Sequence, residues 1–306
     1  MSVTVIGDAT LDVTVRPAEA PRAGGDVPAQ ISISPGGQGA NVAVRLARAG
    51  LDVRLATAIA DDAPGRLLAP ALEADGVHLV RLAAQRSALV ISLLDLAGER
   101  AMLSDRVTLD PAGVAAACVG AEWVHCSAYA LADDAGGDAL ARVLGSLPPS
   151  TRVSLGGGSL QPDFPRSARV RERVATARVA LLVLGRDEAA GLLERPLPSV
   201  AAAADALASG FPGLIAVVTG AAAGSAAAGP GFALSVPAIE QPTPMLDATG
   251  AGDAYAAALI AELLDSSWPP DVQTLRGAME RGSSAGALVS RVLGAQGRTA
   301  AEPTER

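Results

Sequence analysis

The chain of 306 residues contains no lysine, so all 24 of its basic residues are arginines. A composition this biased means that a missing lysine says little against any particular motif. Asparagine is almost absent too, and the single one is Asn41. Cys118 and Cys126 are the only cysteines, which excludes a disulfide-stabilised scaffold and a cysteine-rich zinc site. We expect both to be buried free thiols.

Long hydrophobic runs and clustered positive charge are also missing. No apolar stretch approaches the roughly twenty residues that span a bilayer, and residues 1–6 lack the basic segment that opens a signal peptide. The net charge is −8 and the isoelectric point is about 4.9, with no basic stripe. We therefore expect a cytoplasmic protein that binds neither membranes nor nucleic acid.

What the chain does contain is a regular alternation of helical patterns and short, continuous apolar runs. Four such runs, each after a predicted helix, are expected to be strands: 122–127, 152–155, 179–184 and 213–219. Strands of this kind form parallel sheets that are covered on both faces. The prediction is a single α/β domain over residues 1–306. Residues 13–35 and 88–103 depart from it, because they hold short β-prone pieces and turns instead of helices.

Residues 247–253, Asp-Ala-Thr-Gly-Ala-Gly-Asp, are the most informative stretch, because they lead directly into an apolar helical run. The glycines allow a tight turn, and the N–H groups at the start of the helix form an anion site. An aspartate there would repel an anion, unless it acts as a base. We predict that Asp253 takes a proton from a hydroxyl while the amides hold the phosphoryl group that this hydroxyl attacks.

Other motifs are weaker. Residues 282–286 fit G-x-S-x-G, but that elbow needs a preceding strand and a later histidine, whereas His78 and His125 both lie upstream. Both histidines are expected in ordinary core or surface positions. Residues 7–12 do not match the dinucleotide fingerprint. Gly36-Gly37-Gln38-Gly39 opens a predicted helix and, taken alone, fits a tight turn as well as a functional loop.

Together these segments resemble the PfkB/ribokinase-like carbohydrate kinases. Residues 35–50 are similar to the N-terminal signature of that family, and residues 247–253 are similar to its C-terminal signature. The resemblance covers essentially the whole chain. It implies a ribokinase-like α/β fold with a small β lid, from about 13–35 and 86–106, through which two copies form a homodimer. It also implies an ATP-dependent phosphotransferase that acts on a hydroxyl of a sugar or sugar-like substrate.

The resemblance also implies roles for individual residues. Asp253 is then the catalytic base, and the anion hole consists of Gly250, Ala251 and Gly252. The residues expected to bind the substrate hydroxyls are Asp12, Gly36, Gly37 and Asn41. The residues expected on the nucleotide side are Thr219, Gly220, Gly224 and Glu188, with Glu188 acting on Mg²⁺ through water. Asp247 and Thr249 match a loop that binds a monovalent cation, such as K⁺, in some members.

The chain departs from the family pattern mainly on the phosphate-donor side. Gly185 stands where an asparagine is usual, and Ala221 and Ala223 lie in a loop that normally carries a basic residue. Gly156 replaces an aspartate, and Gln38 replaces a signature lysine. Two alternatives stay open beside a sugar kinase: a nucleoside kinase of the same family, and a sugar- or nucleotide-binding protein with weakened catalysis. A dehydrogenase or a hydrolase has less support. No motif identifies the substrate.

Overall fold

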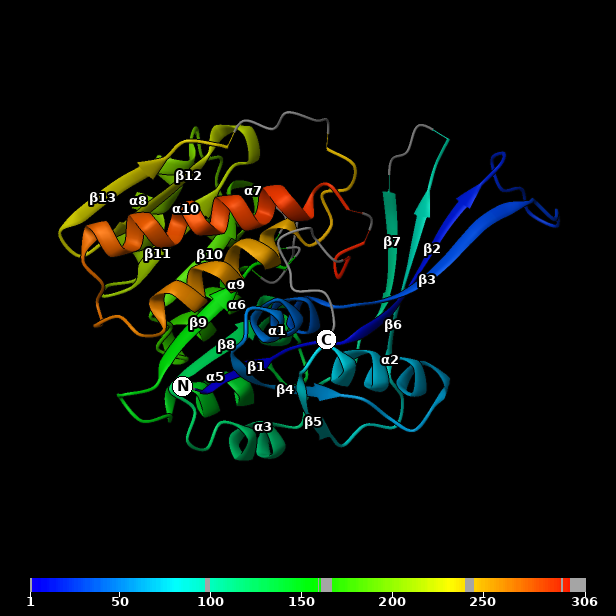
Figure 1. Cartoon of the computed structure of the whole chain (residues 1–306), viewed down its shortest axis with the longest axis horizontal. Coiled ribbons are helices and arrows are strands. Elements are labelled where there is room, and N and C mark those ends of the chain that lie inside the picture. Colours follow the sequence, from blue (N-terminus) through cyan, green and yellow to red (C-terminus); the bar gives the residue numbers. More distant parts are fainter. Residues whose placement is uncertain are drawn as a thin grey trace.

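The computed structural model describes residues 2–96, 100–158, 160, 167–239, 245–292 and 294–297. Its centre is a nine-stranded sheet in the order β13-β12-β11-β10-β9-β8-β1-β4-β5 (Figure 1). The strands are β1 (Ser2–Ile6), β4 (Asp52–Ala58), β5 (His78–Leu82), β8 (Trp123–Ser127), β9 (Arg152–Gly156), β10 (Leu181–Gly185), β11 (Ile215–Thr219), β12 (Ser225–Gly229) and β13 (Phe232–Val236). All neighbours pair in parallel except at β12 and β13, which add an antiparallel edge.

Helices cover both faces of this sheet, as the continuous apolar strands predict. Along β10, Leu181 and Val183 belong to one buried cluster, whereas Leu182 and Leu184 belong to the cluster on the opposite face. One face is covered by α1 (Gln38–Arg48), α2 (Ala63–Ala74), α9 (Ala251–Leu263) and α10 (Val272–Val289). The other face is covered by α3 (Pro111–Ala117), α4 (Ala128–Ala132), α5 (Gly137–Gly145), α6 (Ser167–Thr176), α7 (Arg186–Leu193) and α8 (Val200–Gly210). The fold class predicted from the sequence is confirmed.

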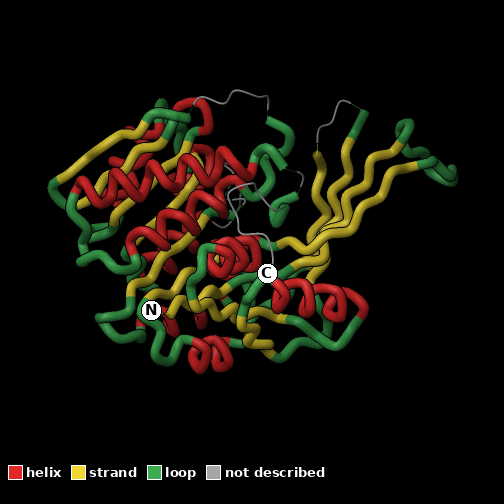
Figure 2. Tube along the Cα trace, in the orientation of Figure 1, coloured by secondary structure: helices red, strands yellow, loops and turns green. Residues whose placement is uncertain are grey.

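A second, four-stranded sheet stands away from the main body, as the tube in Figure 2 shows. Its strands are β3 (Ala29–Gly36), β2 (Thr10–Pro17), β6 (Ala88–Leu94) and β7 (Arg100–Asp105), in that order. They come from the two segments in which the sequence predicted irregular β-prone pieces. We call this sheet the β lid.

The two faces of the β lid differ in polarity because side chains alternate along each strand. Asp12 pairs with Ser34 and Val90 in register, whereas the neighbouring Val13 pairs with Ile33 and Ile91. The face that carries Asp12 looks toward the main body. The opposite face carries the aliphatic rows.

The parallel strands place their carboxyl ends at one edge of the main sheet, beside the β lid. The chain leaves these strands at Gly7, Ser127, Gly156, Gly185 and Thr219. In open α/β sheets this edge is where ligands bind. It is also where β2 leaves β1, so the β lid lies over the same edge (Figure 1).

The structure contains elements that the sequence pattern did not predict. The short helices α4 and α7 follow directly on β8 and β10, and β12 is built from Ser-Ala-Ala-Ala-Gly. Residues 282–286 lie inside α10, so they do not form a hydrolase elbow. The turn predicted within 95–99 lies partly outside the described residues. Among the described residues, no helix is long and apolar enough to cross a bilayer.

Both cysteines are free and buried, as predicted. Burial raises the pKa of Cys118 to about 11, and burial raises the pKa of Cys126 as well. His125 is fully buried, and His78 is exposed at the start of β5.

Candidate functional site

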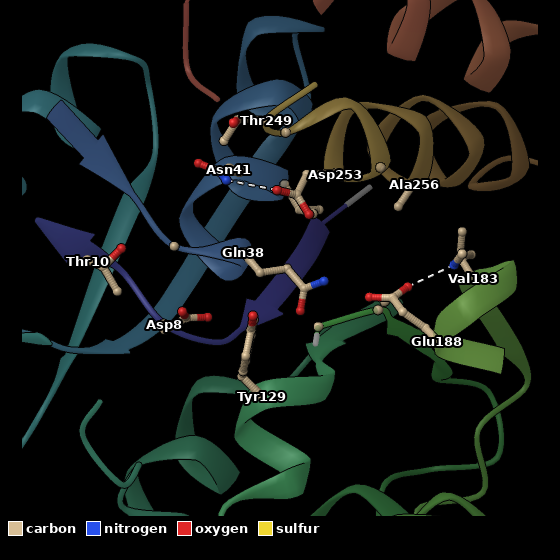
Figure 3. Close-up of a pocket in the computed structure, with 18 of the residues that line it drawn as sticks. Asp8, Thr10, Gln38, Asn41, Tyr129, Val183, Glu188, Thr249, Asp253 and Ala256 are labelled. Atoms are coloured by element: carbon tan, nitrogen blue, oxygen red, sulfur yellow. Dashed lines mark hydrogen bonds between the residues drawn. The ribbon is translucent and has the colours of Figure 1, made fainter. Parts of the chain in front are cut away.

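A cavity of roughly 340 Å³ lies between the carboxyl edge of the main sheet and the β lid. Figure 3 shows side chains from α1, the α9 start and the sheet edge converging on it. Nine of the residues singled out from the sequence line this cavity: Asp12, Gly37, Asn41, Glu188, Thr219, Thr249, Gly250, Gly252 and Asp253. Asp12 and Asn41, both predicted to bind the substrate, line this one cavity. Gly36, Gly220, Gly224, Asp247 and Ala251 lie beside it without lining it.

Asp253 sits in the first turn of α9, and its carboxylate is held by helix α1. The side-chain amide of Asn41 donates a hydrogen bond of 2.8 Å to its Oδ2 (Figure 3). Burial raises the pKa of Asp253 to about 7. The Asn41 hydrogen bond and Arg45 oppose this rise, while the negative charges of Asp8 and Glu188 add to it. A carboxyl tuned close to neutral pH is suited to act as a general base.

The turn before α9 presents backbone N–H groups to the cavity. Gly250 is the N-cap and has φ of +79°, a left-handed conformation that favours glycine. The N–H of Ala251 already donates to Ala248 O at 3.2 Å. The N–H groups of Gly252 and Asp253 follow it in the first turn, where no intrahelical acceptor exists. Gly252 lines the cavity, and among the described residues nothing lies within 4 Å of a Cβ built on it.

Asp12 on β2 faces the cavity, and the position of its carboxylate depends on two close neighbours. The hydroxyl of Thr10 donates to Asp12 Oδ1 at 2.6 Å. Gly36 lies opposite on β3, and a Cβ there would come within 2.1 Å of Asp12 Oδ2. Gly37 has φ of +95°, and a Cβ on it would meet the carbonyl oxygen of Asp8 at 2.5 Å. Gly36 is therefore required by close packing against this carboxylate, and Gly37 by close packing against the backbone of Asp8.

Glu188 lies at the start of α7, on the side of the cavity away from the β lid. Its Oε2 accepts the N–H of Gly185 at 2.8 Å, and burial raises the pKa of this carboxyl. The carboxylate packs against Gly157, where a Cβ would come within 2.1 Å of Oε2. Thr219 lines the cavity at the end of β11, and the loop beyond it carries only alanines and glycines as far as Gly224. Residues 220–224 therefore offer no basic side chain beside Thr219.

Asp247 stabilises the loop before α9 through two hydrogen bonds to backbone N–H groups. Its Oδ1 accepts the N–H of Thr249 at 2.9 Å, and its Oδ2 accepts the N–H of Gly294 at 3.0 Å. In the part of the chain that the structure describes, no three acidic, histidine or cysteine side chains gather as a metal site would require.

The cavity also contains residues to which sequence reasoning gave no role. Arg106, just after β7, forms an ion pair with Asp8, and its guanidinium lies 3.4 Å from the centre of the Tyr129 ring. Gln38 accepts a hydrogen bond of 2.5 Å from the hydroxyl of Ser127. Asp8 and Arg106 share one signal that could have drawn attention to them, since each is a charged residue within two positions of the end of a strand. Tyr129 carries no such signal.

His125 lines the cavity from β8. Its Nδ1 lies 2.9 Å from Ser154 Oγ, and burial lowers its pKa to about 4, so the ring is neutral at physiological pH. It cannot supply positive charge to the site.

Comparison with known proteins places this arrangement in a family. The sequence profile of the pfkB family carbohydrate kinases matches residues 1–301. The chain belongs to this family. It is a carbohydrate kinase, as the two glycine-rich signatures predicted.

Individual relatives agree with the family. The kinase is 29% identical over 313 residues to a fructokinase of Klebsiella pneumoniae, covering 96% of this chain and 94% of the relative. The ribokinase of Cryptococcus neoformans var. grubii serotype A, solved with ADP, superposes with a TM-score of 0.76 at 20% identity, with 96% and 95% of the two chains covered. A fructokinase double mutant of Vibrio cholerae O395, solved with fructose, ADP and a potassium ion, gives 0.74 at 21% identity, with 96% and 94% covered. At these identities the two structures support the fold.

Proposed function

We propose that this kinase transfers the terminal phosphoryl group of ATP to a hydroxyl of a sugar, with Asp253 as the base. The observation that carries the proposal is the position of this carboxyl. It is partly buried, its pKa is raised to about 7, and it lies in the first turn of α9, beside the backbone N–H groups that open the helix. A base and an anion site side by side suit attack of an alcohol on a phosphoryl group.

In this scheme each group has one task. The substrate hydroxyl lies against Asp253, which accepts its proton as the oxygen attacks phosphorus. The N–H groups of Gly252 and Asp253 stabilise the negative charge on the transferred group, and Gly250 gives the turn its shape. Asp12 binds the other hydroxyls of the substrate, since a carboxylate accepts two hydrogen bonds or more. We also propose that Asn41 binds these hydroxyls, in addition to its hydrogen bond with Asp253.

The donor side fits a nucleotide only in part. Thr219, Gly220 and Gly224 are proposed to lie along ATP, and Glu188 to orient water on Mg²⁺. Mg²⁺, when bound, would neutralise charge on the donor phosphates. Because the loop 220–224 contributes no cation, the helix N-terminus has to supply most of the protein's own attraction for phosphate. For K⁺, Asp247 and Thr249 are the proposed residues, because carboxylate and hydroxyl oxygens can ligate a cation.

The acceptor is proposed to be a sugar, because the curated relative is a fructokinase and the lining beneath the β lid is polar. Charged and hydroxyl-bearing groups there include Asp8, Asp12, Ser92 and Arg106. The alternative within the same chemistry is a nucleoside. The alternative from another class is a sugar- or nucleotide-binding protein with weakened catalysis, which the alanines at 221–223 favour.

A homodimer through the β lid is part of the proposal. The lid face that looks away from the cavity carries exposed aliphatic side chains, with Ile31 62%, Ile33 59% and Leu103 62% accessible. A contiguous exposed apolar patch of this kind marks a protein contact. The cytoplasm, where ATP is abundant, is the compartment we propose.

One assay tests the proposal. The purified kinase is incubated with ATP and Mg²⁺ and a panel of hexoses, pentoses, their acids and nucleosides, and ADP release is followed by a coupled enzyme reaction. Stimulation of ADP release by a sugar supports the proposal, and stimulation by nucleosides alone supports the nucleoside alternative. Binding of a sugar in calorimetry without any ADP release would support the weakened binding protein.

A further inference from the structure

The last described segment of the chain, residues 294–297, is held against helix α1 by two arginines. Arg45 donates to the carbonyl oxygens of Ala295 at 2.7 Å and of Gly297 at 2.8 Å. Arg48 donates to the carbonyl oxygen of Gln296 at 2.9 Å and is itself fixed by Asp75, through two bonds of 2.8 Å each. Three consecutive carbonyl groups are thus bound from one side of one helix.

The side chain of Gln296 points back into the same helix and reaches Asn41. Its Nε2 donates to Asn41 Oδ1 at 3.0 Å, and Asn41 Nδ2 in turn donates to Asp253 Oδ2 at 2.8 Å. Asn41, Arg45 and Arg48 are spaced by four and three residues, so they share one helix face. A continuous hydrogen-bonded relay therefore runs from the C-terminal segment to the carboxyl at the start of α9.

The direction of this relay matters because an amide side chain has a donor end and an acceptor end. If the Asn41 amide rotated by half a turn, its oxygen would face the carboxylate of Asp253, and two acceptors would repel each other. With Gln296 Nε2 as the donor, this rotation would also break the bond between Gln296 and Asn41, so Gln296 opposes it. The donor end of Asn41 is therefore held toward Asp253.

We propose that Gln296 is a positioning residue that orients Asn41, and through it the carboxylate of Asp253, so that the base is set only when the segment 294–297 is docked on α1. The proposal deepens the proposed kinase mechanism and rests on it for the role of Asp253. Gln296 touches neither the substrate nor the reacting atoms in this scheme.

The same segment also supports the anion-binding turn, which gives the docked state a second consequence. The N–H of Gly294 donates to Asp247 Oδ2, and Asp247 Oδ1 accepts the N–H of Thr249. Ala295 packs on the N-cap of α9, where a Cβ at Gly250 would lie 2.8 Å from the Ala295 Cα. Residues 294–297 thus contact both parts of the proposed catalytic site: the base through Asn41, and the anion hole through Gly250.

Several charged groups act on Asp253 from the elements around it. Asp8, after β1, and Glu188, on α7, favour its protonated form, while Arg45 on α1 and the Asn41 amide favour its ionised form. Asp12 and the neutral His125 line the same cavity. Among the described residues, the Gln296 side chain bonds to Asn41 and to none of these charged groups, so a change in the titration of Asp253 would report on the orientation of Asn41.

Two substitutions remove the donor in different ways. Gln296→Leu removes all hydrogen bonding at similar size. Gln296→Glu keeps the shape but leaves only acceptors when ionised, so that it draws the donor end of Asn41 toward itself and away from Asp253. In both variants the midpoint for ionisation of Asp253 should rise by about one pH unit, which equals about 1.4 kcal/mol of lost preference for the charged form.

The midpoint is read in two ways. The first is the acid limb of kcat/KM for the best sugar, which reports the free enzyme. The second needs no activity: protein labelled with ¹³C in the aspartate carboxyl groups is titrated by NMR, and the Asp253 signal is identified by its loss in Asp253→Asn. Gln273→Leu and Gln273→Glu, at an exposed glutamine at the start of α10, are the matched controls and should leave both readouts unchanged.

A shift toward higher pH in both Gln296 variants supports the proposal. A lower melting temperature with an unshifted midpoint would show that Gln296 is only a packing residue and would overturn it. If one variant does not fold, the other decides. A chain that transfers no phosphoryl group at all would refute the kinase mechanism, whereas the NMR midpoint would still decide on the relay.

Discussion

The side-chain amide of Asn41 lies 2.8 Å from Oδ2 of Asp253, although 212 positions separate the two residues in the chain. Asn41 comes from the first glycine-rich signature and Asp253 from the second. The bond joins the start of α1 to the start of α9, and these two helices pack side by side on one face of the sheet. The two signatures are therefore parts of a single site.

The partly buried carboxyl of Asp253 should make the protein less stable as pH rises. Its pKa is raised from 3.8 to about 7, so the folded chain holds the proton more tightly than the unfolded chain. The resulting stabilisation is complete below about pH 4 and is lost as pH rises through about 7. Three pH units at 1.36 kcal/mol each set a ceiling of about 4 kcal/mol.

Asp253→Asn removes this dependence. Relative to the wild type, the free energy of unfolding of the variant should rise between pH 5 and pH 8, by about 2–4 kcal/mol in total. Urea unfolding at each pH measures the difference. Two curves that run parallel from pH 5 to pH 8 would mean that folding does not raise the pKa of this carboxyl.

Gly36→Ala should weaken sugar binding without touching the sugar directly. The new Cβ would lie 2.1 Å from Asp12 Oδ2, so the carboxylate must move out of place. We expect the dissociation constant of the sugar to rise about 10-fold or more, on the scale of one lost charge-assisted hydrogen bond, and ATP affinity to stay unchanged. Gly277→Ala is the control, because nothing lies within 4 Å of a Cβ there. Equal sugar affinity in both variants would remove Asp12 from the binding site.

ATP binding should be weak and should depend strongly on Mg²⁺, because the loop after Thr219 offers no basic side chain. Ala223 is exposed in this loop. Ala223→Arg should tighten ATP binding by about 2–5-fold, corresponding to the 0.5–1 kcal/mol of a solvated ion pair. Calorimetry with and without Mg²⁺ checks this, with Ala222→Arg as the neighbouring control. A tight site that does not need Mg²⁺ would show that the nucleotide loop has been misplaced.

The aliphatic face of the β lid should hold two copies together. Ile33→Asp puts a charge in the centre of that face, opposite Val13, and should convert a dimer into a monomer. Light scattering after size-exclusion chromatography measures the mass. Gln30→Asp, on an exposed position of the same strand, is the control. A wild type that is already monomeric at micromolar concentration would end this part of the proposal.

Much of the fold could be predicted from local patterns. Leu181–Leu184 is a continuous apolar run whose side chains alternate between the two cores, and this run predicted a central strand. The glycine-rich stretch that contains Gly250 and ends at Asp253 predicted the turn before α9. The strand β12 could not be predicted, since Ala226–Ala228 has no strand preference and is placed by pairing with β11 and packing on α8. The partners of Asn41 and Arg106 could not be predicted either. Each contact depends on how distant elements meet in space, which no local pattern records.

The role of Asp253 as the base is the central claim, and the turnover of Asp253→Asn tests it most directly. The new amide oxygen can still accept the Asn41 hydrogen bond, so the fold and the sugar affinity should be kept. Without a base, kcat with saturating ATP, Mg²⁺ and sugar should fall by about 10²–10⁴-fold. Turnover close to that of the wild type, with sugar affinity and melting temperature intact, would contradict the account.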